Sequence, residues 1–121
     1  GWRLADFCKT QYASRHGWEH FLKCHRGVVE LLGQAESLGL RLKVQDEGEL
    51  WETGSHARLR RKLEEYNQGV AALGGALKDA LGGAIESPIF QQPDFEHLEA
   101  GGMAVLGSRV AETVRLVKKF T

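Results

Sequence analysis

The sequence has no excess of charge of either sign and no long apolar run. Lysine and arginine together number 16, as do aspartate and glutamate, so the formal net charge is zero. A dedicated nucleic-acid or membrane-surface binder needs a basic excess, so this balance argues against both partner classes. No apolar run reaches the ~20 residues of a membrane span. Neutrality also means that copies of the chain do not repel one another, and we expect a protein partner or a homodimer.

Cysteine is scarce as well. Cys8 and Cys24 are the only two, too few for a disulfide framework. Free thiols are typical of a reducing compartment, so we expect a cytoplasmic protein. A chain of 121 residues is long enough to bury a core of its own. We expect residues 1–121 to form a single compact domain, either a whole protein or a part of a longer chain.

No motif in the sequence is specific enough to name a reaction. A Walker loop, a Rossmann glycine pattern, a nucleophile elbow and an HExxH zinc motif are all missing. The glycine-rich run at residues 73–83, LGGALKDALGG, lacks the Lys-Ser end of a phosphate loop and falls within a helical period. We therefore expect no cofactor, and we see no resemblance to a known family.

Apolar residues recur with a helical period in three segments. The first covers residues 17–38, the second covers 55–81, and the third begins at 93–94 and runs towards the C-terminus. In the second segment the apolar residues alternate in steps of three and four, as a helix-packing seam requires. That seam comprises Leu59, Leu63, Tyr66, Val70, Leu73, Leu77 and Leu81, and a row of small residues beside it comprises Ala72, Ala76 and Ala80. The small residues predict that a neighbouring backbone comes close.

Between the first two helical segments the period changes from 3.6 to 2. Leu42 and Val44 alternate with polar residues, which predicts a strand with one buried face. Gly48 suits the positive φ of a tight turn, and residues 49–53 are expected to return as a second strand. Residues 2–13 fit a strand or a helix, and their Thr, Tyr and Phe favour the strand. The expected fold is helix-dominated α+β, with three helices packed against a small antiparallel β-hairpin in the order β?-α-β-β-α-α, the first strand being left open.

The register of this hairpin decides where Glu52 points. A three-residue loop at 46–48 would place Glu52 on the apolar side with Leu42, where a desolvated carboxylate suits general acid or base catalysis. A loop of two or four residues would turn Trp51 inward and set Glu52 opposite Lys43 as an exposed ion pair. We favour the second register, because burying the larger indole gains more than the turn preference costs.

The candidate catalytic residues are Glu52, His20 and His56. His16, His20 and Cys24 are spaced by four, which suits a zinc site on one helix, but Gly17 at the helix start would move His16 off that face, and we expect no metal. His25 lies on the apolar stripe of the same helix, where we expect a buried histidine with a hydrogen-bond partner.

The candidate binding residues are Trp51, Arg58 and Arg61. Cations crowd the first turns of the second helical segment, against the helix dipole, which predicts a site for an anion or an acidic partner. The simpler interpretation pairs Arg60 with Glu64 and Arg61 with Glu65 on a solvated face, and we favour it.

Our leading hypothesis is a non-enzymatic protein-interaction module that self-associates through helix faces. Its basis is the second helical segment, which carries a leucine seam and a row of small residues and so has two faces that can pack. The alternative is a small enzyme or ligand-binding protein with a pocket between the hairpin and the helices, using Glu52, Trp51 and His20. The sequence itself does not distinguish a partner from a substrate.

Overall fold

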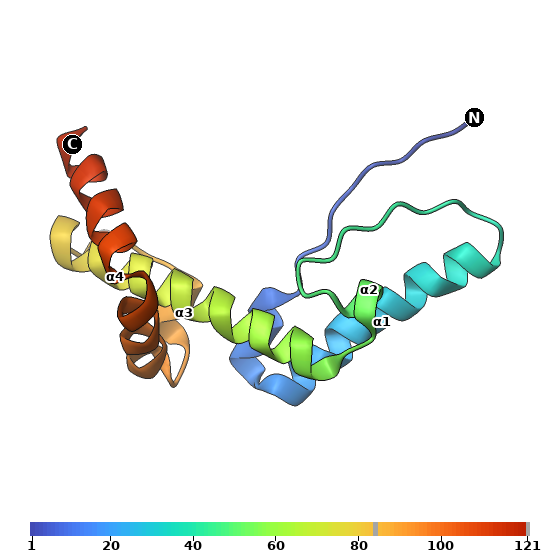
Figure 1. Ribbon diagram of the computed structural model, residues 1–121, viewed down its shortest axis with the longest axis horizontal. Coiled ribbons are helices and arrows are strands. Elements are labelled where there is room, and N and C mark those ends of the chain that lie inside the picture. Colours follow the sequence, from blue (N-terminus) through green and yellow to red (C-terminus); the bar gives the residue numbers. More distant parts are fainter. Residues whose placement is uncertain (84, 121) are drawn as a thin grey trace. The chain divides into compact units, whose positions relative to one another are not determined.

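The computed structural model describes residues 1–83 and 85–120 (Figure 1). Three long helices dominate, and shorter helical turns lie between them. In chain order the elements are η1 (Gln11–His16), α1 (Trp18–Ser37), α2 (Leu50–Thr53), α3 (His56–Leu81), η2 (Pro88–Gln91) and α4 (Phe95–Lys119). The three helices predicted from the apolar periodicity are confirmed.

The predicted β-hairpin is wrong, because neither the described residues 1–83 nor 85–120 contain a strand. Residues 40–46 have irregular backbone, and the segment expected as the second strand forms the helical turn α2. The side chains still alternate between inward and outward positions although these residues form no β-ladder. Leu42 and Val44 are partly buried, while Arg41 and Lys43 are exposed. The period of two therefore indicated correctly which side chains face inward, but it did not indicate that a neighbouring strand exists.

The turn between these segments also differs from the expected one. The sequence predicts a positive φ at Gly48, but Glu49 adopts the left-handed conformation instead, with φ of 61°. Gly54 follows with φ of 67° and ends α2. At the N-terminus, residues 2–10 form no strand and lead into η1, so the first strand is wrong as well.

The chain divides into two compact units, residues 1–56 and 57–121. In the first unit, η1 and α2 pack against α1. Phe21 on α1 and Leu50 on α2 are its buried apolar side chains, at 3% and 5% exposure. The rings of Trp18 and His25 lie on either side of Phe21, with centroids 5.9 and 5.5 Å away. The expectation of one compact domain stays a prediction.

The second unit has its core where η2 meets α3 and α4. Ala71, Ile89 and Leu98 are buried there, and Val70, Phe90 and Phe95 pack against them. The rings of Phe90 and Phe95 meet edge to face at 5.2 Å. The Phe90 ring also lies 3.4 Å from the position of a Cβ on Gly74, so the glycine leaves room for the aromatic side chain.

Helix α4 crosses α3 at Ala72, one residue of the row of small residues. Ala72 is fully buried, and a Cβ on Gly102 of α4 would lie 2.7 Å from the Ala72 Cβ and would overlap the Gln68 carbonyl oxygen. The predicted close approach is therefore confirmed, and its partner is a helix of the same chain. Helix α4 is continuous through Gly101–Gly102, and Gly102 lies at the crossing with α3. Among the described residues, no helix combines the length and apolar character of a membrane span.

Substituting Gly102 tests this crossing. Gly102→Ala should lower the free energy of unfolding by about 1–3 kcal/mol, because the new Cβ meets a backbone atom that cannot move aside cheaply. The matched control is Gly107→Ala on the same helix, where the nearest atom is the Met103 Cε at 3.9 Å. That change should stabilise the protein by about 1 kcal/mol through helix propensity. Chemical denaturation of both variants measures the difference, and equal responses would contradict the crossing.

Candidate functional site

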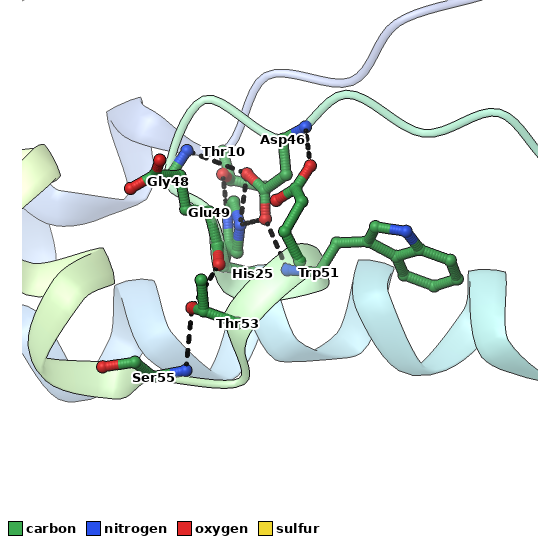
Figure 2. Close-up of polar contacts among 9 residues, drawn as sticks. Thr10, His25, Asp46, Gly48, Glu49, Trp51, Thr53 and Ser55 are labelled. Carbon is green, nitrogen blue, oxygen red and sulfur yellow. Dashed lines mark hydrogen bonds and ion pairs between the residues drawn. The ribbon is translucent and has the colours of Figure 1, made fainter.

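The best connected polar cluster of the first unit joins three segments through one imidazole (Figure 2). His25 on α1 contacts the Asp46 carboxylate through Nε2, at 3.0 and 3.1 Å from its two oxygens. The His25 Nδ1 lies 2.7 Å from the Thr10 hydroxyl, just before η1. The imidazole thereby ties the N-terminal segment and the 40–49 segment to α1.

Asp46 also organises the backbone around itself. Its Oδ1 accepts a hydrogen bond from the Gly48 N–H at 2.9 Å, and its Oδ2 accepts one from the Trp51 N–H at 3.0 Å. In return, the Glu52 Oε1 accepts from the Asp46 N–H at 3.0 Å. The bond from the Trp51 N–H satisfies one of the free N–H groups in the first turn of α2, and the bonds from the Gly48 and Asp46 N–H groups shape the turn that precedes the helix. These bonds explain locally why residues 50–53 turn into a helix and do not extend.

The cluster is shielded from water, with side-chain exposures of 15% for His25 and 9% for Asp46. Burial raises the pKa of the Asp46 carboxyl, but the hydrogen bonds from His25, Trp51 and Gly48 and the charge of His25 together bring that pKa below its ordinary value of 3.8. Asp46 is therefore a carboxylate at neutral pH, and it accepts without donating. In the neutral imidazole, Nε2–H then donates to Asp46, and Nδ1 accepts from the Thr10 hydroxyl.

Chemically, this is a hydroxyl–imidazole–carboxylate chain. A carboxylate that fixes the tautomer of an imidazole, which then accepts a hydroxyl proton, is the connection by which serine and threonine nucleophiles are activated. Catalysis also needs a concave pocket and donors for an oxyanion. An open hollow of about 460 Å³ is lined by Phe90, Gln92, Pro93, Asp94, Phe95, Glu96 and His97. None of these residues takes part in the hydroxyl–imidazole–carboxylate contacts. The cluster is best understood as a clamp that holds the first unit together.

The three catalytic candidates do not form one site. Glu52 is exposed and binds the Asp46 N–H, so neither predicted register, with Leu42 or with Lys43, describes it. His20 is exposed on α1 and lies near Cys24, and His56 is exposed as the first residue of α3. Within the part of the chain that is described, no hydrogen bond or ion pair links His56 to Glu52 or His20.

The binding candidates lie apart from the imidazole as well. Trp51 is partly buried, its N–H is held by Asp46, and Figure 2 shows its indole directed away from the cluster. Arg58 and Arg61 are exposed in the first turns of α3. Arg60 lies 3.5 Å from Glu64, as the predicted pairing along the helix requires.

His16, His20 and Cys24 come closer than we expected. The Cys24 Sγ is 3.6 Å from the His20 Nε2, and the rings of His16 and His20 meet edge to face with centroids 5.4 Å apart. The argument that Gly17 would remove His16 from this face is wrong, because the turn at Gly17 sets η1 against the start of α1. As the side chains stand, no three His, Cys, Asp or Glu residues of the described ranges converge well enough to hold a metal ion.

Sequence reasoning identified His25 as a buried histidine with a partner. Both contacts of its ring confirm the partner, whereas the side chain is only partly buried, at 15% exposure. The same reasoning missed both partners. Asp46, two residues before Gly48, has the spacing of a side chain that bonds the backbone two residues ahead, which was a usable signal. Thr10 carried none, because its contact spans fifteen residues.

The chain finds no match among protein-family models, curated proteins or solved structures. The proposed function below therefore rests on the geometry of the chain itself.

The stability of the first unit should depend on the Asp46 carboxylate. The carboxyl pKa is lowered on folding, so its stabilisation is present above about pH 4, near the ordinary value of 3.8, and is lost as the pH falls through the folded-state value. Asp46→Asn should lower the free energy of unfolding by about 1–3 kcal/mol at neutral pH, because a buried acceptor pair becomes unmatched.

The measurement is chemical denaturation at a series of pH values. The gap between the wild type and Asp46→Asn should close as the pH drops below about 4, since the wild type then loses its charge too. Glu47→Gln is the matched control, because Glu47 is an exposed neighbour and its replacement should leave stability within about 0.5 kcal/mol of the wild type. A gap that stays constant with pH would contradict the role given to the carboxylate.

Proposed function

We propose that this protein is an interaction module that associates with a second copy of itself. The surface we assign to the contact is the leucine row of α3, defined as Leu63, Tyr66, Val70, Leu73 and Leu77. One observation carries the proposal: every residue of this apolar row keeps part of its side chain exposed, although α4 and η2 pack against neighbouring faces of α3 in the second unit.

The coverage of α3 follows from its contacts. Gly102 of α4 meets Gln68 and Ala72, and Gly69 lies 3.6 Å, measured from a Cβ placed on it, from Leu106 of α4. On a neighbouring face, Ala71 is buried among the side chains of η2 and α4. The leucine row lies beside these two faces, and among its members Val70 also packs against the core cluster. Tyr66 is the most exposed residue of the row, with 44% of its surface accessible to water.

The exposed surface of the chain supports a need for a partner. The chain exposes 9217 Å². Two separate folded domains, each of half this chain's mass, would together expose about 7,800 Å². The large apolar side chains left in water include Trp2, Leu4, Phe7, Leu31, Leu38, Tyr66, Val105 and Phe120. Extensive exposed apolar surface is a mark of proteins that bind other proteins.

A second copy fits this row for two reasons. The spacing of three and four residues is that of a helix pair, and the same row on another copy is complementary to itself about a two-fold axis. The net charge is zero, so the approach of two copies meets no overall repulsion.

The alternative, a small enzyme, has lost the pocket on which it was based. That pocket required a hairpin, and the residues concerned form an irregular segment and the α2 turn. Glu52 is engaged with the Asp46 backbone, and Trp51 is directed away from the imidazole cluster. The observations therefore favour the interaction module over the enzyme.

Charged substitution in the row tests the proposal. Leu73→Lys should raise the dissociation constant of the dimer at least about tenfold, equivalent to ~1.4 kcal/mol, because the contact must then bury an ammonium group. Sedimentation velocity from low-micromolar to near-millimolar protein measures the association. Circular dichroism should show an unchanged helix content, since Leu73 is not fully buried in a single copy.

Glu65→Lys is the matched control, because Glu65 is exposed on α3 and lies off the row. It should dissociate no dimer. A wild type that stays monomeric at the highest concentration would overturn the proposal, and so would a dimer that Leu73→Lys leaves intact.

A further inference from the structure

We propose that the leucine row of α3 pairs with the same row of a second copy in the antiparallel direction, with the two-fold axis beside Val70. The inference rests on the proposed self-association and adds the direction of the two helices, which that proposal leaves open. Two separate features of α3 support it: the distribution of its charges along the helix, and the order of large and small side chains along the row.

Two-fold symmetry allows either direction of pairing. In a parallel pair, each residue of the row meets the same residue of the other copy. In an antiparallel pair, each residue meets the one that lies equally far on the other side of the axis. Val70 is the middle of the row, with Leu63 seven residues before it and Leu77 seven residues after it. Leu63 then faces Leu77, so the contact is apolar in both directions and the row alone does not select one.

The charges of α3 differ between its two halves. Residues 57–69 carry four cations and two carboxylates, a net charge of plus two, at Arg58, Arg60, Arg61, Lys62, Glu64 and Glu65. Residues 70–81 carry Lys78 and Asp79 and are neutral. Parallel pairing would place the two positive halves side by side, together with the positive ends of both helix dipoles. Antiparallel pairing places each positive half beside a neutral one, so the charges favour the antiparallel direction.

The difference is clear at Lys62, the cation that directly precedes Leu63 of the row. Packed helices lie about 8–10 Å apart, so in a parallel pair the two Lys62 side chains would stand at one level, about one screening length from each other. In an antiparallel pair they are about fourteen residues apart along the helix, or about 21 Å, which is beyond the screening length. Lys62 then faces Ala76, which directly precedes Leu77 and carries no charge.

The sizes of the side chains favour the same direction. Tyr66 is the largest residue of the row, and Val70 is the smallest. A parallel pair would bring two copies of Tyr66 together at one level and two copies of Val70 together at the next. In an antiparallel pair Tyr66 faces Leu73, because these two residues lie four before and three after Val70. A large side chain that faces a smaller one keeps the distance between two helices even.

Crosslinking through introduced cysteines measures the direction. Cys8→Ser and Cys24→Ser first remove both natural thiols from every sample. Lys62→Cys and Ala76→Cys are then made as separate variants, at positions that flank the row and keep its apolar side chains. In the antiparallel dimer, position 62 of one copy faces position 76 of the other. Two copies of the same position stand about 21 Å apart along the helix, beyond the reach of a short crosslinker.

The two variants are mixed, allowed to exchange subunits and treated with a short bismaleimide. The mixture should form covalent dimer at least about tenfold faster than either variant alone, because facing thiols react at the high effective concentration of one complex. Leu73→Lys introduced into both variants is the control, and it should remove this covalent dimer, since it dissociates the contact. Circular dichroism and sedimentation velocity of each variant check that it folds and associates before the crosslinker is added.

The outcomes separate the direction of pairing from the self-association itself. Either variant alone forming covalent dimer as fast as the mixture would show parallel pairing, which overturns the inference and leaves the proposed function standing. A dimer in sedimentation that no combination of the two variants crosslinks overturns the inference as well. A chain that stays monomeric in sedimentation overturns the proposed function, and the inference falls with it.

Discussion

The carboxylate of Asp46 is the interaction on which the first unit depends. It accepts hydrogen bonds from the backbone at Gly48 and Trp51 and from the His25 imidazole. The first two start the α2 turn, and the third fixes that turn to α1. The Asp46 carboxylate is largely shielded from water, and both of its oxygens accept hydrogen bonds. Residues 40–46 are therefore irregular and residues 50–53 form a helical turn, although the side chains alternate as in a strand. Leu50 is buried as a result, at 5% exposure.

The long helices could be predicted from the sequence because their evidence is local. A period of 3.6 over twenty or more residues in α1 and α3 outweighs any single contact. The segment at 40–53 could not be predicted, because alternation describes which side chains are inward and is silent on whether a strand partner exists. The conformation of that segment depends on Asp46 and on its contact with His25, which lies 21 residues earlier in the chain. Sequence patterns alone do not reveal such a pair.

The candidate sites divide in the same way. His25 was found because it lies on the apolar stripe of a helix, whereas Thr10 and Asp46 were missed because they meet it only in the fold. Glu52 was singled out for chemistry, and its carboxylate instead accepts a hydrogen bond from the Asp46 N–H. Ala72, in the row of small residues, predicted a close neighbour correctly, and that neighbour is α4. The leucine row is the face of α3 that we propose for a partner.

The sharing of one imidazole between Thr10 and Asp46 links two stretches of chain that are remote in sequence. Any opening that withdraws the ring of His25 releases both stretches at once, so they behave as one cooperative unit of local unfolding. The N-terminal segment at Thr10 and the turn at Asp46 therefore lose their contacts with α1 in the same event.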